Sequence, residues 1–272
     1  MPTAEANGLT LYYEEHGEGE PLLCVQGLSV NTLGWALQVQ AFAAAHRTVI
    51  FDNRDVGRST IVESGYEIAA MAADALALAD VLGLDRFHLL GVSMGGAVAQ
   101  EVALGAPDRV STLTLGVTFA RGGAWARKLG ETWGARRLKQ SREEHIDELL
   151  LLTLSEGFYE NEGAVDYVRG LMLADPNPQP AEAFVRQLEA SSRHDAHDRL
   201  GSLELPTHVI GGEHDILIPV WKSRELAELV PGARLTVIEG SPHGANLERA
   251  EEFNRLVLDF VAEVNHRPTE VR

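Results

Sequence analysis

Cysteine is nearly absent from this sequence, which has Cys24 alone among 272 residues. A single cysteine excludes an internal disulfide and is typical of a reducing compartment, so we expect a cytoplasmic location. The sequence also has no apolar run of about 18 residues, which argues against a transmembrane helix. Residues 1–7 lack the basic segment and the apolar stretch of a secretory signal.

Basic residues are scarce as well: 23 stand against 40 acidic residues, and the formal net charge is −17. This balance disfavours nucleic acid and anionic membranes as partners. One segment departs from it, because only Glu131 opposes seven basic side chains. They are Arg121, Arg127, Lys128, Arg136, Arg137, Lys139 and Arg142. A solvated helix face is the simplest interpretation. A pocket mouth that attracts anions and a subunit contact in a homo-oligomer are the alternatives.

What the sequence does contain is an alternation of apolar runs and helical stretches. Continuous apolar runs of this kind are typical of strands buried on both faces of a parallel sheet. An alternating stretch at 9–16 predicts an edge strand. The other predicted strands are 21–25, 48–51, 86–90, 111–119, 207–210 and 235–238. The predicted helices that lie between and after these strands are 33–45, 68–82, 97–104, 220–229 and 248–264. This order predicts an α/β protein with a mostly parallel sheet flanked by helices.

The alternation stops between residues 120 and 203, where only helical patterns occur. The predicted helices there are 124–139, 143–154, 165–174 and 181–192. We therefore divide the chain into a core of residues 1–119 and 204–272 and an inserted helical segment of residues 120–203.

The stretch Gly91-Val92-Ser93-Met94-Gly95-Gly96 has the form G-x-S-x-G and joins a predicted strand to a predicted helix. The chain must bend sharply at the serine, and the flanking glycines remove Cβ atoms that would clash there. Such a bend raises the serine hydroxyl at the carboxyl edge of a sheet, beside the free N–H groups of a helix N-terminus. The alternative is a glycine-rich helix start that only packs on a strand.

A nucleophilic serine needs a base within hydrogen-bond reach and an acid that orients the base. In a parallel sheet, reactive groups collect at the carboxyl ends of the strands. After Ser93, strand 207–210 runs into Asp215, and strand 235–238 runs into His243. No carboxylate closely follows strand 111–119, since the next acid is Glu131. The predicted order is therefore Ser, Asp, His.

With these residues in place, the sequence resembles the α/β-hydrolase superfamily. The matching motifs, in family order, are Gln26-Gly27, Asp52-x-Arg54 with Gly57 and Ser59, the elbow at Ser93, Gly212-Glu213-His214-Asp215, Pro219 and His243-Gly244. They span most of residues 9–265, and the inserted helical segment resembles the variable lid of the family.

The resemblance implies a role for each matching residue. Ser93 is the expected nucleophile, His243 the general base and then acid, and Asp215 the orienting acid. Glu213 is the alternative acid, because some members use glutamate. The backbone N–H groups of Leu28 and Met94 are the expected oxyanion donors.

Two departures from the family pattern fall near the oxyanion loop. Gln26 stands where histidine is usual, and Asp55 stands where glycine is frequent. We expect Gln26 to hold the loop through its amide group. Because of these two departures, the family pattern does not define the conformation of the oxyanion loop.

Several tryptophans and histidines are candidates for binding, but each also has a simpler structural interpretation. With Gln26, the tryptophans Trp35, Trp125 and Trp133 are candidates for substrate binding, although core packing explains tryptophans equally well. The pattern His194-Asp195-Ala196-His197-Asp198 suggests a metal site, but capping at a helix end explains it more simply. We expect no metal.

The resemblance favours a serine hydrolase that cleaves a small-molecule carboxylic ester or lactone through an acyl-Ser93 intermediate, without metal or organic cofactor. The alternatives are a carbon–carbon bond hydrolase and a cofactor-free perhydrolase of the same fold. A non-catalytic ligand-binding receptor is the alternative from another class.

Overall fold

Within residues 2–266, which the computed structural model describes, an eight-stranded sheet runs in the order β1-β2-β4-β3-β5-β6-β7-β8. β2 pairs antiparallel with β1 and β4, and the strands from β4 to β8 pair in parallel. The strands are β1 (Thr3–Ala6), β2 (Leu9–His16), β3 (Pro21–Val25), β4 (Arg47–Phe51), β5 (Phe87–Val92), β6 (Val110–Gly116), β7 (Thr207–Gly212) and β8 (Arg234–Ile238). The predicted mostly parallel sheet is confirmed, whereas β1 carries no clear sequence pattern and was not among the predicted strands.

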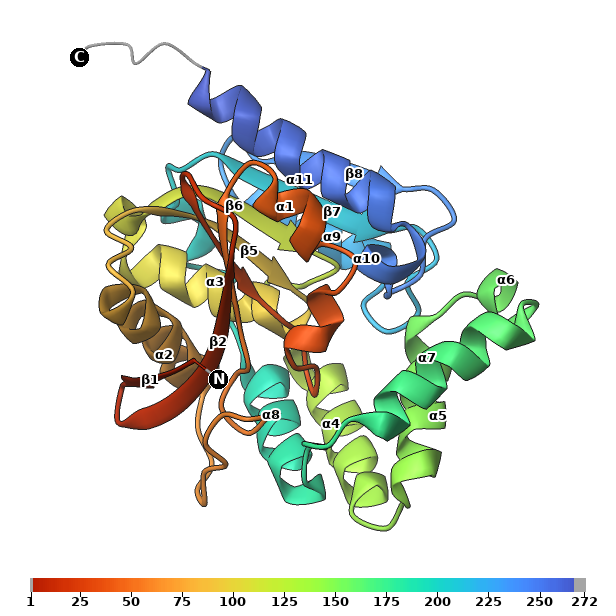
Figure 1. The fold of residues 1–272 in the computed structure, drawn as a ribbon. Coiled ribbons are helices and arrows are strands. Elements are labelled where there is room, and N and C mark those ends of the chain that lie inside the picture. The colour runs from red at the N-terminus through yellow and green to blue at the C-terminus, as the bar shows by residue number, and fades with distance from the viewer. Residues whose placement is uncertain (1, 267–272) are drawn as a thin grey trace.

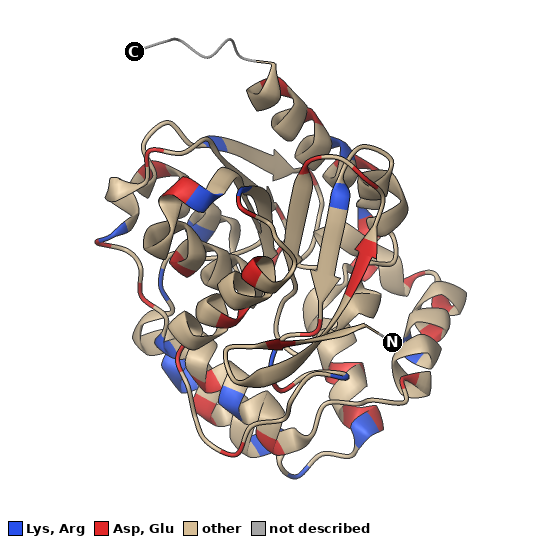
Figure 2. Ribbon diagram, turned by 60° about the vertical axis from the view of Figure 1, so that its left-hand side comes forward, with Lys and Arg blue, Asp and Glu red and all other residues tan. Residues whose placement is uncertain are grey.

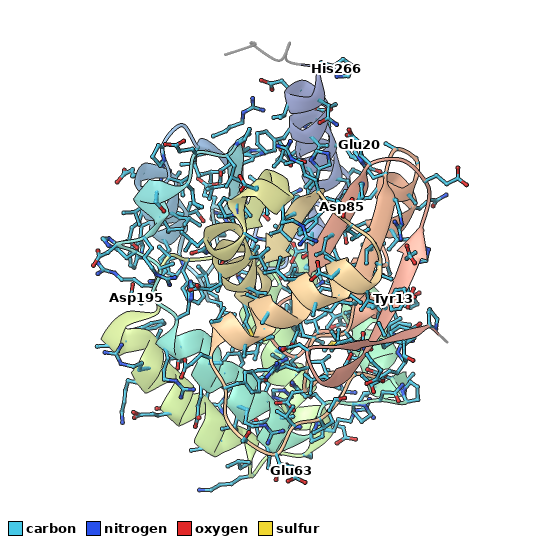
Figure 3. The ribbon with its side chains drawn as sticks, turned by 90° about the vertical axis from the view of Figure 1, so that its left-hand side faces the viewer. Tyr13, Glu20, Glu63, Asp85, Asp195 and His266 are labelled. Carbon is cyan, nitrogen blue, oxygen red and sulfur yellow. The ribbon has the colours of Figure 1, made fainter. Side chains whose placement is uncertain are left out.

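Helices cover both faces of the sheet, and each face has its own hydrophobic core (Figure 1). β3 shows how alternate side chains serve the two cores: Leu23 and Val25 belong to one, and Leu22 and Cys24 to the other. The first core includes α2 (Ile68–Val81), α3 (Met94–Gly105) and α9 (Val220–Leu229), and the second includes α1 (Val39–Ala43), α10 (Ala245–Glu248) and α11 (Ala250–Asn265). The end of α11 reaches the loop before β3, where Asn265 donates a hydrogen bond to Glu20 (Figure 3).

The helix predicted over 33–45 is two shorter elements. A 3-10 helix, Thr32–Trp35, comes first, and α1 follows it after a break. The side chain of Asn31 caps the 3-10 turn by accepting from the N–H of Leu33 at 3.0 Å. The short turn brings Gly34 so close to Gln26 that an added Cβ would lie 2.5 Å from its Nε2. The 3-10 turn therefore packs directly against the loop after β3.

Between β6 and β7 the chain forms a separate helical lobe, which we call the helical insertion (residues 123–193; green in Figure 1). Its two ends meet, since Arg121 and Asp195 form an antiparallel bridge and the N–H of Gly122 donates to the carbonyl of His194 at 3.0 Å. Asp195 marks this junction in Figure 3. The helices of the insertion are α4 (Gly123–Arg137), α5 (Arg142–Thr153), α6 (Glu156–Tyr159), α7 (Glu162–Ala174) and α8 (Ala181–Arg193). No helix in residues 2–266 has the length and apolar character to cross a membrane.

The close packing of α3 on β3 generates a stability prediction. A Cβ on Gly95 would lie 2.1 Å from the backbone oxygen of Val25, whereas a Cβ on Gly105 of the same helix would meet nothing within 4 Å. Gly95→Ala should therefore lower the free energy of unfolding by about 3 kcal/mol, because it overpacks backbone against backbone. Gly105→Ala should be neutral or stabilise by up to about 1 kcal/mol. Urea unfolding of both variants measures the difference, and equal stabilities would contradict this packing.

Candidate active site

Ser93 sits at the bend between β5 and α3 in a backbone conformation that side chains rarely adopt. Its φ is 56° and its ψ is −122°. Such a conformation costs about 1–3 kcal/mol and persists only where the surroundings enforce it. The N–H of Ser93 donates to the carbonyl of Gly116 at 2.9 Å, and the Thr118 hydroxyl donates to the carbonyl of Ser93 at 2.6 Å. These bonds fix the bend and leave the hydroxyl at the N-terminus of α3.

Three side chains form a hydrogen-bonded chain at the carboxyl edge of the sheet. The Oγ of Ser93 lies 3.0 Å from Nε2 of His243, and Nδ1 of His243 lies 2.7 Å from Oδ2 of Asp215. The other oxygen of Asp215 accepts from the N–H groups of Leu217 and Ile218 at 2.9 and 2.7 Å. Because a carboxylate can only accept, Nδ1 of His243 carries the proton, and Nε2 is free to accept the serine proton.

Glu213 does not contact His243. Its carboxylate accepts from the N–H of Gly240 at 2.9 Å, and its side chain is half exposed. Asp215 is therefore the acid that orients the imidazole in this structure.

The loop after β3 lies directly against Ser93. A Cβ on Gly27 would be 3.1 Å from the Cβ of Ser93, so a side chain at this position would push the loop and the serine slightly apart. The Oε1 of Gln26 accepts from the N–H of Gly27 at 2.8 Å, a contact that supports the expected loop-holding role of Gln26. Within residues 2–266, nothing accepts a hydrogen bond from the N–H of Leu28 or of Met94. The role of these two N–H groups as oxyanion donors stays a prediction.

Helix α8 supplies a contact to this loop that the sequence did not reveal. Ser29 has a positive φ of 68°, and its N–H donates to Oε1 of Gln187 at 3.0 Å. The Nε2 of Gln187 donates to the carbonyl of Arg54 at 2.8 Å, and the Gln187 side chain is completely buried. Gln187 therefore ties the loop that carries Leu28 to the loop after β4.

Helix α8 also contacts Asp55, the residue that stands where glycine is frequent in the family. Asp55 also has a φ of 68°, which aspartate tolerates better than most residues. Its carboxylate accepts from Nε and Nη2 of Arg186 at 2.9 and 2.8 Å and from the Tyr66 hydroxyl at 2.9 Å. Hydrogen bonding to Asp55 raises the pKa of Arg186, while burial and then the nearby Asp55 charge raise the pKa of Tyr66. Asp55 thus anchors the helical insertion to the core.

The three candidate tryptophans occupy different environments. Trp35 is completely buried in the core with Phe42, and Trp125 is 62% exposed. Trp133 packs against Phe184 in a cluster that also includes Leu28 and Leu217. Of the three, Trp133 belongs to the cluster that contacts the loop after β3, and its role in binding stays a prediction.

The basic segment mostly faces solvent. Arg121 pairs with Glu225 at 3.5 Å, Lys128 with Glu131 at 2.8 Å, and Arg136 with Glu148. Figure 2 shows basic and acidic segments interspersed on the lower helices, which belong to the insertion. Arg137 differs, because it is buried.

His194 and His197, which follow the end of α8, have different partners. Nε2 of His194 is buried 3.3 Å from Oε1 of Gln100, and burial lowers the pKa of His194 to about 4. His197 contacts Asp198 at 2.8 Å. In the described part of the chain, no group of three or more His, Cys, Asp or Glu side chains has the arrangement of a metal site.

Comparison with known proteins places this geometry in context. A model of the alpha/beta hydrolase fold matches residues 20–250. The chain is 29% identical to a proposed carbamate hydrolase, RutD, of Azorhizobium caulinodans, and the match covers 97% of this chain and 100% of that protein. It is 31% identical to 2-hydroxy-6-oxononadienedioate/2-hydroxy-6-oxononatrienedioate hydrolase 2 of Pseudomonas putida, over 93% and 92% of the two chains. The crystal structure of the enol-lactonase from Burkholderia xenovorans LB400 superposes with a TM-score of 0.87 at 27% identity, over 96% and 100% of the chains.

The contacts of Asp215 and Glu213 generate a paired prediction. Asp215→Asn should lower turnover of an accepted ester by about 10⁴-fold, because an amide stabilises the wrong imidazole tautomer. Glu213→Gln should change turnover little, since its carboxylate contacts the backbone N–H of Gly240 and the exposed His214 but not His243. Steady-state kinetics on both variants checks this, and a larger loss in Glu213→Gln would reverse the assignment.

Gln187 generates a second prediction. Gln187→Ala removes the acceptor of the Ser29 N–H and should loosen the loop that presents the Leu28 N–H. Turnover should fall by about 10–10³-fold, the range observed when one oxyanion donor is disturbed, with a smaller change in KM. Gln179→Ala is the control, because Gln179 donates to Gln187 at 3.0 Å without contacting Ser29. Wild-type turnover in a folded Gln187→Ala protein would show that the loop does not depend on α8.

Proposed function

The chain belongs to the alpha/beta hydrolase family, and on that premise we propose that it cleaves a carboxylic ester or lactone through an acyl-Ser93 intermediate. The observation that carries the proposal is the chain of contacts from Ser93 to His243 to Asp215, at 3.0 and 2.7 Å. A serine hydroxyl becomes an effective nucleophile when a base oriented in this way accepts its proton.

The proposed reaction has two steps. In the first, Ser93 attacks the carbonyl carbon while Nε2 of His243 takes the hydroxyl proton, and the Leu28 and Met94 N–H groups bind the oxyanion. The C–O bond to the leaving group then breaks, and His243 gives its proton to the departing oxygen. In the second step, His243 takes a proton from water, and the hydroxide attacks the acyl carbon. The bond from that carbon to Oγ of Ser93 then breaks, the carboxylic acid leaves, and His243 returns its proton to Ser93.

The names of the similar proteins bear on the substrate. They include a proposed carbamate hydrolase, an enol-lactonase and a dienedioate hydrolase, so hydrolysis is common to them while the substrate varies. The close superposition on the enol-lactonase over nearly the whole chain is the reason to propose an ester or lactone here. We further propose that the helical insertion acts as the lid, since its Trp133 cluster packs on Leu28.

Ser93→Ala tests the proposal. The substitution should lower hydrolysis of a chromogenic ester such as 4-nitrophenyl acetate by about 10⁶-fold, because the nucleophile is lost. The fold should be unchanged, which thermal unfolding checks. Ser192→Ala is the matched control, because Ser192 only donates to a carbonyl within α8. Hydrolysis at the wild-type rate by Ser93→Ala would exclude the mechanism, and a wild-type protein without any esterase or lactonase activity would favour a non-catalytic receptor.

A further inference from the structure

Three buried side chains of the helical insertion have polar atoms without a partner. Among the described residues, nothing forms a hydrogen bond with Nε1 of Trp133, Nε of Arg137 or either ring nitrogen of His145. Each of these side chains is less than a tenth exposed. Buried polar atoms in folded proteins are nearly always bonded, so unpaired ones grouped together require an explanation.

Two of the three side chains contact one aromatic ring, and the third is close to both of them. Trp133 and His145 both contact Phe184 edge to face, with ring centroids 5.2 and 4.6 Å apart. Arg137 follows Trp133 by one turn of α4, so the two side chains lie on the same face of that helix. Burial, and secondarily the Arg137 charge, lowers the pKa of His145 to about 4, which agrees with their proximity. The unpaired atoms therefore belong to one region inside the insertion.

This region adjoins the candidate active site. Trp133 and Phe184 share their cluster with Leu28, whose N–H is an expected oxyanion donor. Leu217, whose N–H donates to Asp215, belongs to the same cluster. The unpaired atoms therefore lie in the part of the insertion that packs on the loops carrying Leu28 and Leu217.

Arg137 differs from Arg54, which is also buried, and from the partly buried Arg186. Arg54 makes two hydrogen bonds of 2.6 Å to Asp74, and Arg186 is held by both oxygens of Asp55. Within residues 2–266, no carboxylate forms an ion pair with Arg137, and the charge of the exposed Glu182 raises its pKa less than burial lowers it. A guanidinium stays protonated in proteins, and a buried one without an anion is costly.

We propose that Arg137, Trp133 and His145 form a subsite for a carboxylate, so that the substrate is an ester or lactone that also carries a free carboxylate group. The two oxygens of a carboxylate offer about four acceptor positions, which suit N–H donors from all three side chains. Charge-assisted bonds to Arg137 would supply most of the selectivity. This inference rests on the proposed function, because it names the substrate class of the same site.

The exposed basic residues need not take part. A preference that arises from contact with a buried guanidinium should persist at high salt, whereas attraction by exposed charges is screened within about 8–10 Å. Lys139 is an exposed cation two residues beyond α4, and it serves as the matched control for charge.

The first test compares monomethyl and dimethyl esters of the linear dicarboxylic acids from succinate to suberate. Each pair offers the same methyl ester with and without a free carboxylate, and the series varies the separation between the ester and the carboxylate. At one or more chain lengths, kcat/KM of wild type should favour the monoester by about 10–100-fold, as one or two charge-assisted bonds predict. Ratios of one at every length, with both esters hydrolysed, would overturn the subsite and leave the proposed function intact.

The second test changes the cation. Arg137→Met should bring the monoester-to-diester ratio close to one, and Lys139→Ala should leave the ratio as in wild type. Arg137→Met should also unfold at the same or a higher temperature, since an apolar side chain replaces an unpaired buried charge. A variant that keeps the wild-type ratio, or that loses stability without losing the ratio, would assign Arg137 a structural role instead.

The third test does not depend on turnover. Ser93→Ala should bind the free dicarboxylate of the preferred length in calorimetry, and adding Arg137→Met should weaken binding at least about 10-fold. Adding Lys139→Ala should not. Failure of every dicarboxylate in the series to bind would overturn the subsite even if no ester were hydrolysed, so the two proposals fail independently.

Discussion

The strained backbone at Ser93 is the constraint on which the site depends. A residue with a side chain keeps a φ of 56° only where the surrounding structure enforces that conformation. Here an added Cβ on Gly91 would lie 2.3 Å from the carbonyl oxygen of Gly95, and one on Gly95 would lie 2.1 Å from that of Val25. The closeness of β3, β5 and α3 therefore sets both the bend and the distance from Ser93 to the loop after β3.

The parallel sheet then brings the remaining groups to the serine. His243 contacts Ser93 across 150 positions of sequence and Asp215 across 28, because the strands before all three end at one edge. The three residues could be predicted from the sequence, because each of them follows an apolar run that predicts a strand. The position of carboxylates after the strands excluded every candidate for the orienting acid except Asp215 and Glu213. The choice between Asp215 and Glu213 needed the structure, since two residues in one loop can point to opposite sides.

The contacts of α8 could not be predicted in this way. Gln187 and Ser29 are 158 positions apart, and Arg186 and Asp55 are 131 apart. A helical pattern gives the buried face of α8 but not its partner on another element. For the same reason the sequence could not separate Trp133 from Trp35 and Trp125, or Arg137 from six other cations, because burial distinguishes them and periodicity does not. The helical insertion thus holds the loops beside Ser93 through the contacts of α8. It also contains buried polar groups that have no partner among the described residues.

The proposed mechanism requires that Ser93 forms a covalent acyl intermediate. Intact-protein mass spectrometry after reaction with a fluorophosphonate, which traps activated serines, tests it most directly. We expect one adduct per chain, located by peptide mapping on Ser93, with loss of activity in proportion to labelling and much slower labelling of His243→Ala. Labelling at another residue, or an active enzyme that stays unlabelled at Ser93, would contradict it.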